Sequence, residues 1–207
     1  AALSADGIYV YEANVVTIDQ TGDIIVQQVN PDDTTTPWND TSLSDLQTTD
    51  AGHVKLVTLA GSITVNEGDA DDTGVSAATT GSILLEARGS AGDVIFNADL
   101  SSGSGHITVS AEDDVDGNAD ITTVDGTVFI WGRNGAVDGA PNDGVNLAGA
   151  AVINSGRGNV RIVAGNESDI WLNQTLAGAG SVSLVAQRDI RDNNGAANNI
   201  TAAALRL

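Results

Sequence analysis

This chain contains no cysteine and no methionine, and aromatic residues make up only 3% of its 207 positions. A disulfide framework is therefore excluded. No apolar run approaches the ~20 residues that a membrane-spanning helix needs. Basic residues are also few, because 8 Lys and Arg stand against 28 Asp and Glu, for a formal net charge of −20. Such a charge repels nucleic-acid phosphates and anionic membrane surfaces, so we expect no nucleic-acid partner. The short apolar runs lead us to expect no membrane span.

What the sequence does contain is a repeated strand pattern. Six heptapeptides begin with Gly, skip one residue and then place apolar or small residues at alternate positions. They are Gly52–Thr58, Gly81–Ala87, Gly105–Ala111, Gly126–Gly132, Gly158–Ala164 and Gly180–Ala186. Period-two alternation is typical of a strand with one buried face, and its recurrence roughly every 20–30 residues indicates a solenoid.

Stacking these heptapeptides predicts three inward ladders of equivalent side chains. The first ladder is Val54, Ile83, Ile107, Val128, Val160 and Val182. The second is Leu56, Leu85, Val109, Ile130, Ile162 and Leu184. The third is Thr58, Ala87, Ala111, Gly132, Ala164 and Ala186, whose small size suits a corner. The leading Gly suits the opposite corner, where a positive φ is expected.

A second strand follows each of the first in most coils, often after an Asp: Asp93, Asp120, Asp169 and Asp189. Segments 15–18 and 22–26 together resemble an earlier coil. We therefore predict an all-β fold, a parallel β-helix (β-solenoid) that forms a single domain over residues 1–207. It should have about 7–8 coils of roughly 20–24 residues. Polar, turn-rich segments predict insertions without strands at about residues 30–50, 67–80 and 133–143.

One acidic segment has the spacing of a calcium loop. Its oxygen-bearing side chains are Asp114, Asp116, Asn118, Asp120 and Asp125. The first four alternate and the last stands at the twelfth place, as in an EF-hand. Ala119 stands where that loop needs Gly, and the flanks are strands rather than helices. Ca²⁺ binding and a solvated acidic turn therefore both remain open, and Asp69, Asp71 and Asp72 form a weaker calcium candidate.

Catalytic motifs are poorly represented. His53 and His106 both occupy the second place of the strand pattern, where other coils carry Ser, Thr or Asn, so an exposed strand position explains them. There is no cysteine nucleophile and no Gly-x-Ser-x-Gly elbow. We expect a protein that is not an enzyme, with a glycan-processing β-helix enzyme as the less favoured alternative.

Several outward strand positions are apolar where a lone rod should be polar. They are Leu84, Phe129, Trp131, Val163 and Val185. An exposed apolar stripe usually marks a contact site. Either another chain covers this stripe, or the insertion at residues 133–143, which leaves directly from Trp131, folds back over it.

The C-terminal third resembles a known family. Gly180-Ser-Val-Ser-Leu-Val-Ala, then Asp189-Ile, then Asn199-Ile-Thr-Ala is similar to the repeats of filamentous haemagglutinin-like large bacterial exoproteins, and a looser resemblance extends over residues 50–207. The resemblance implies a right-handed parallel β-helix, secretion to the cell surface and adhesive or scaffolding work. It carries over no catalytic or ligand residue.

From these features we expect a non-enzymatic, extracellular structural or adhesive segment of a bacterial cell-surface protein or fibre. The alternative is a calcium-dependent, self-assembling subunit of a surface layer or filament. The expected partners are copies of the same chain, joined through the lateral apolar face or through coil ends, and a cell-surface or glycan receptor. The expected location is extracellular.

Overall fold

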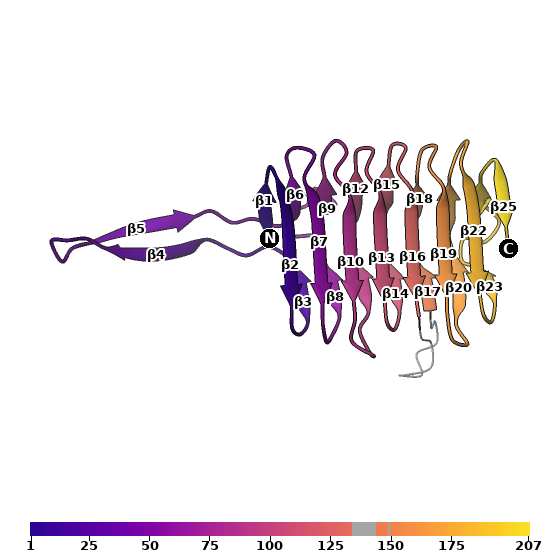
Figure 1. Ribbon diagram of the computed structural model, residues 1–207, viewed down its shortest axis with the longest axis horizontal. Helices are drawn as coiled ribbons and strands as arrows, with labels where there is room; N and C mark the ends of the chain where they lie inside the picture. Colours follow the sequence, from indigo (N-terminus) through magenta and orange to yellow (C-terminus); the bar gives the residue numbers. More distant parts are fainter. Residues whose placement is uncertain (134–143, 149) are drawn as a thin grey trace.

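The fold is an all-strand rod, as the repeat predicts. The computed structural model describes residues 1–133, 144–148 and 150–207, and within these ranges it contains no helix. Three long parallel sheets of 8, 8 and 7 strands run side by side along the rod (Figure 1). Neighbouring strands in each sheet come from successive coils. The chain is therefore a parallel β-solenoid, and the hand of its winding stays a prediction.

Each full coil contributes one strand to each sheet, in the order A, B, C. Sheet A consists of β1 (Ala2–Ser4), β6 (Leu46–Thr48), β9 (Thr73–Ala77), β12 (Asp99–Ser102), β15 (Ile121–Thr123), β18 (Val152–Asn154), β21 (Gln174–Leu176) and β24 (Ile200–Thr201). Sheet B consists of β2 (Gly7–Glu12), β7 (His53–Thr58), β10 (Ile83–Ala87), β13 (Ile107–Ala111), β16 (Val128–Gly132), β19 (Val160–Ala164), β22 (Ser181–Ala186) and β25 (Ala204–Arg206). Sheet C consists of β3 (Val16–Ile18), β8 (Ile63–Val65), β11 (Val94–Phe96), β14 (Val115–Gly117), β17 (Gly144–Leu147), β20 (Asp169–Leu172) and β23 (Ile190–Asp192).

The sequence predicts two strands in most coils. This prediction is wrong, because each full coil has three strands. Strands of sheet A are mostly three or four residues long, too short for a clear alternation to be read from the sequence. As a result, the sequence pattern does not separate the strands of sheet A from those of sheet C. Asp93 and Asp169 belong to the sheet C side of the coil, whereas Asp120 directly precedes β15 in sheet A.

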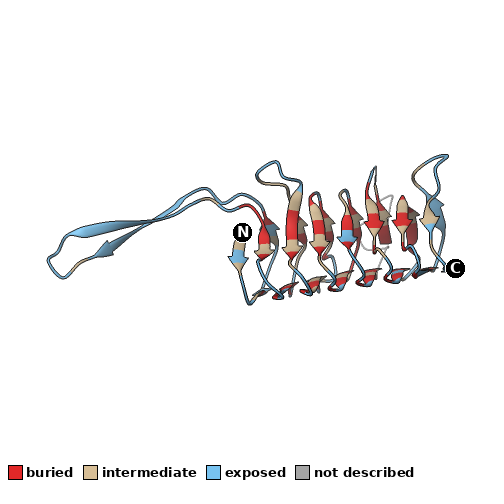
Figure 2. Cartoon of the chain, turned by 90° about the horizontal axis from the view of Figure 1, so that it is seen from above, coloured by how far each residue is buried: buried red, intermediate tan, exposed pale blue. Residues whose placement is uncertain are grey.

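The ladders of sheet B are confirmed residue by residue. Ile107 pairs with Ile83 on one side and with Val128 on the other, and Val109 lies between Leu85 and Ile130 in the same way. All twelve aliphatic side chains of the first two ladders are buried. Figure 2 shows the buried positions recurring along successive strands. Burial of each such side chain contributes about 1.5–3 kcal/mol to the stability of the rod.

The leading glycines of sheet B have a different cause from the one expected. Gly52, Gly81, Gly105, Gly126, Gly158 and Gly180 are not among the residues with positive φ. Instead, a Cβ added to Gly105 would lie under 3.0 Å from the carbonyl oxygen of Gly81, and four other glycines of this row meet the oxygen of the preceding one in the same way. The row is glycine because successive backbones approach one another too closely for any side chain.

Polar side chains at the corners bond from coil to coil. Asp99 Oδ1 accepts the backbone N–H of Asp120 (2.9 Å), and Asp120 Oδ1 accepts that of Val152 (2.8 Å). On the sheet C side, Asp169 Oδ1 accepts the N–H of Asp189 (2.9 Å). The Asp that precedes many strands is thus a side-chain acceptor for the next coil, which supplies a partner to a backbone donor at the corner.

The first coil and the first insertion differ from the sequence expectation. Segment 16–18 is β3 of sheet C, but segment 22–26 does not complete that coil. It enters β4 (Ile24–Val29), which pairs antiparallel with β5 (Thr35–Asp40) in a hairpin that projects beyond the N-terminal end of the rod (Figure 1). The expectation of a strandless excursion over residues 30–50 is therefore wrong, because it contains β5 and then β6.

The structure tests only one of the other two predicted insertions in full. The segment at residues 67–80 is only partly a loop, because β9 lies inside it and pairs with both β6 and β12. The insertion at residues 133–143 falls outside the described residues except for Arg133.

Candidate functional site

The five apolar residues predicted to face outward all lie on the outer surface of sheet B, and all are half-buried. Trp131, Val163 and Val185 are register neighbours in β16, β19 and β22 and so form a continuous row. Phe129 lies beside Trp131, with ring centroids 6.1 Å apart and planes tilted by 54°. Leu84 is separated from Phe129 along its row by Thr108. The structure therefore gathers four of the five into one apolar patch, which we call the Trp131 patch.

Two aromatic residues of the same sheet face were missed by the sequence reasoning. Tyr9 and Tyr11 lie in β2, in register with Lys55 and Val57 of the next coil, and their side chains are 61% and 56% exposed. The Lys55 Nζ lies 4.9 Å from the centre of the Tyr11 ring. A signal was present, because Ile8 and Val10 alternate with outward residues as the inward pairs of the other six strands do, although Gly7 is in register with His53 and not with the leading Gly52.

A single basic residue covers part of the Trp131 patch. The guanidinium carbon of Arg133 lies 4.0 Å from the centre of the Trp131 ring, and the same guanidinium pairs with Glu112. A groove of about 400 Å³ runs beside it, with Val163 and Val185 in its lining. The remainder of the segment expected to cover the stripe, residues 134–143, is outside the described part of the chain. The patch thus combines two aromatic rings and two aliphatic side chains with the Arg133–Glu112 ion pair at its edge.

The predicted calcium segment has an extended geometry. It runs through β14 and β15, and its polar side chains bond to neighbouring coils. Asp114 Oδ1 accepts the N–H of Gly144 (2.6 Å), and Asp116 Oδ1 accepts from Asn146 Nδ2 (3.2 Å). Asn118 Nδ2 donates to Asn97 Oδ1 (2.8 Å).

The five side chains of that segment therefore do not surround a common point in the way an EF-hand loop does. Asp120 bonds to the amide of Val152, as described above, and Asp125 is exposed at the corner between β15 and β16. Within the described part of the chain, these aspartates form no group of three whose ligand atoms lie within 4.8 Å of one another.

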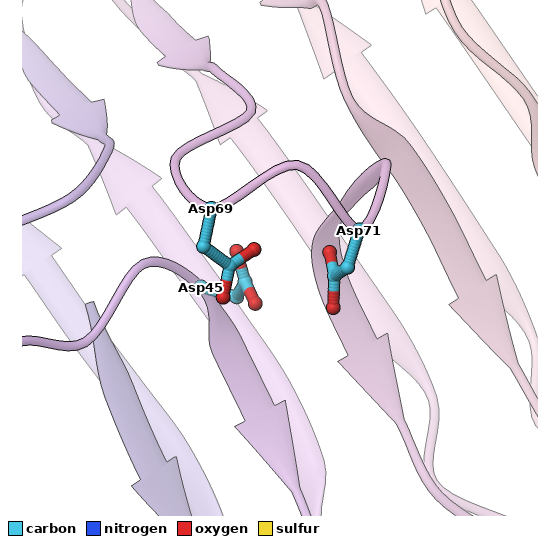
Figure 3. Close-up of side chains that lie close together, drawn as sticks. All are labelled: Asp45, Asp69 and Asp71. Atoms are coloured by element: carbon cyan, nitrogen blue, oxygen red, sulfur yellow. The ribbon is translucent and has the colours of Figure 1, made fainter.

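The weaker acidic candidate is the one that the structure assembles. Carboxylate oxygens of Asp45, Asp69 and Asp71 lie within 4.8 Å of one another (Figure 3), and this is the only such group of three among the described His, Asp and Glu residues. Asp72, which the sequence also suggested, is not part of the group. Asp45 was missed because it precedes Asp69 by more than twenty positions, and only the stacking of one coil on the next brings them together.

The two histidines bond along the rod. His53 Nδ1 accepts the backbone N–H of Ser82 (2.9 Å), and His106 Nδ1 accepts that of Thr127 (3.0 Å). Both rings are exposed. They occupy the same ladder position in alternate coils, as the sequence predicted, and each provides an acceptor to the coil that follows.

Comparisons with protein-family models, with curated proteins and with solved structures found no match. Among the described residues, no helix has the length and apolar character to cross a membrane. The function proposed below therefore rests on the fold and on the chemistry of its surface.

Proposed function

We propose that this chain is a non-enzymatic structural or adhesive segment of an extracellular bacterial surface protein or fibre, and that it associates laterally with copies of itself through the Trp131 patch. The proposal follows the resemblance of its repeats to those of filamentous haemagglutinin-like exoproteins. In a surface protein of this kind, the stacked coils of the solenoid give the molecule its length, and the outer faces of its sheets provide the contact surfaces.

The observation that carries the proposal is the composition of the outer face of sheet B. Trp131, Val163 and Val185 form one row across three adjacent coils, and Phe129 widens it. A continuous row of this kind is the usual sign of a contact surface on a soluble protein. Aromatic residues and Arg are also enriched at the centres of protein interfaces, and Arg133 already stacks on Trp131.

Sedimentation velocity tests the lateral contact. The chain should sediment as dimers or larger species at high concentration, and Trp131→Ser should shift the population to the monomer. Trp171→Ser provides a matched control, because Trp171 is also half-buried and lies under an arginine, Arg191, at 5.1 Å, but in sheet C. The control should keep the association of the parent chain. A chain that is monomeric at high concentration, and unchanged by either substitution, would exclude the lateral contact.

A further inference from the structure

The strongest unassigned feature is the acidic group at the root of the hairpin. Asp45 stands immediately before β6, where the chain returns from the hairpin to the rod. Asp69 and Asp71 lie in the loop that leads from β8 to β9. Strand β6 pairs with β9 in parallel register, with Leu46 opposite Val75. The segments that lead into these two strands therefore lie next to each other in successive coils. The three carboxylates therefore come from two successive coils and converge at one place (Figure 3).

A buried oxygen without a partner distinguishes this group from an ordinary acidic surface. Asp45 is only 5% exposed. Its Oδ2 accepts a hydrogen bond from Gln47 Nε2 (2.7 Å), whereas its Oδ1 is buried and has no hydrogen-bond partner. The hydroxyl of Ser42 is also buried and unpartnered, and both residues line the same pocket of about 230 Å³. A buried carboxylate oxygen left unpaired is strongly unfavourable, so a cation or a hydrogen-bond donor at this oxygen would stabilise the fold.

The electrostatic surroundings agree with a cationic ligand. None of the three carboxylates forms an ion pair with a described basic residue. The carboxylates of Asp69 and Asp71 lie close to that of Asp45, so their negative charges repel it. A bound cation would remove both the repulsion and the unpaired oxygen.

We propose that Asp45, Asp69 and Asp71 bind one Ca²⁺ ion, which fastens the base of the hairpin to the following coil. Carboxylate and hydroxyl oxygens are hard ligands of the type that Ca²⁺ prefers, and Ca²⁺ tolerates irregular geometry with 6–8 oxygens. Ser42, whose unpartnered hydroxyl lies in the same pocket as Asp45 and Asp69, is the candidate for a fourth protein ligand. Asp71 also accepts the N–H of Thr73 (2.8 Å), which fixes its orientation. The site is independent of the Trp131 patch, so either proposal can fail alone.

Calorimetric titration of chelator-treated protein with CaCl₂, paired with thermal unfolding, tests the site. We expect one ion per chain and a Tm raised by several degrees in Ca²⁺. Asp45→Asn should abolish both effects. Because Asp45 is buried, the exposed pair Asp69→Asn with Asp71→Asn provides a second variant that does not disturb packing, and it should abolish them too. Asp50→Asn removes an exposed charge beyond the other end of β6 and should leave both intact.

Three results would overturn the proposal. Loss of binding in Asp116→Asn, with binding kept in Asp45→Asn, would place the ion in the segment 114–125. Weak uptake of many ions that no variant changes would show only the attraction of Ca²⁺ to a chain of net charge −20. If Ca²⁺ has no effect, and Asp45→Asn stabilises the protein at neutral pH without it, Asp45 is a buried acid that destabilises the fold rather than a metal ligand.

Discussion

The coils of the rod and strand β4 of the β4–β5 hairpin are both rich in branched apolar residues, yet only the coils bury them. Ile107 in β13 is fully buried between equivalent residues of two neighbouring coils. By contrast, every residue of β4 and β5 is exposed. The exposed large side chains of the hairpin are Ile24, Ile25, Val26, Val29 and Trp38. An apolar strand sequence therefore predicts a strand, but it does not tell whether a second layer will cover it.

The hairpin is held by local bonds instead of by a core. At its tip the N–H of Asn30 donates to the carbonyl of Thr34 (2.8 Å), and across its strands Trp38 Nε1 donates to Gln28 Oε1 (2.7 Å). A lone two-stranded hairpin is only marginally stable in water. The rod, in contrast, repeats the same contacts from coil to coil, so each coil stabilises its neighbours. Substitutions at matched positions of the two regions should therefore have very different effects.

The largest difference is expected for a charge placed in each region. Ile107→Asp buries an unpaired carboxylate in the core and should reduce the free energy of unfolding by about 4 kcal/mol or more. Ile25→Asp introduces the same group at a position that is 61% exposed and should change it by less than about 0.5 kcal/mol. Urea denaturation followed by circular dichroism measures both. Equal effects would contradict the assignment of Ile107 to the core.

A smaller difference is expected for glycine. Gly105→Ala forces a methyl group against the backbone of Gly81 and should destabilise the rod by about 2–3 kcal/mol. At the base of the hairpin, Gly22 has φ +27° and no atom near its missing Cβ, so Gly22→Ala should cost only about 1 kcal/mol of backbone strain. The same denaturation experiment distinguishes them. A greater loss for Gly22→Ala would mean that backbone conformation, and not close stacking, selects glycine in the rod.

The smallest difference concerns pH. The hydrogen bond from Arg188 lowers the pKa of the buried Asp169, burial opposes this, and the bond from Asp189 and the charges of Arg188 and Arg191 add to the lowering. Because the folded pKa lies below the unfolded value, this stabilisation is complete above the ordinary pKa of 3.8. It is lost as the pH falls through the lowered folded pKa.

Asp169→Asn should therefore cost about 1.5 kcal/mol at neutral pH. It should also flatten the decline of stability between about pH 5 and pH 2. Asp32 in the hairpin provides the comparison, because hydrogen bonds from Thr34 lower its pKa as well, but it is exposed. Asp32→Asn should leave the pH profile almost unchanged. Unfolding measured across this pH range would refute the role of Asp169 if both variants follow the parent curve.

The sequence by itself determined the repeat unit. The alternation in Gly105–Ala111 and its five counterparts identified six of the eight strands of sheet B, their inward residues and their register, because a parallel stack places each side chain on its equivalent. The outward position of Trp131 followed from the same alternation. Short strands such as β18 and β21 could not be read in this way, since three residues carry too little periodicity to distinguish a strand from a turn.

Only the tertiary structure decided how the polar residues are used. Asp114, Asp116 and Asp120 alternate in the sequence like calcium ligands, but stacking provides each with a partner in a neighbouring coil. The sequence around Asp45 has no spacing typical of a metal site. Asp45 lies beside Asp69 and Asp71 only because β6 and β9 pair in sheet A. The physical reason is that apolar burial follows local periodicity, whereas a polar site depends on which distant segments the fold brings within a few ångströms of one another.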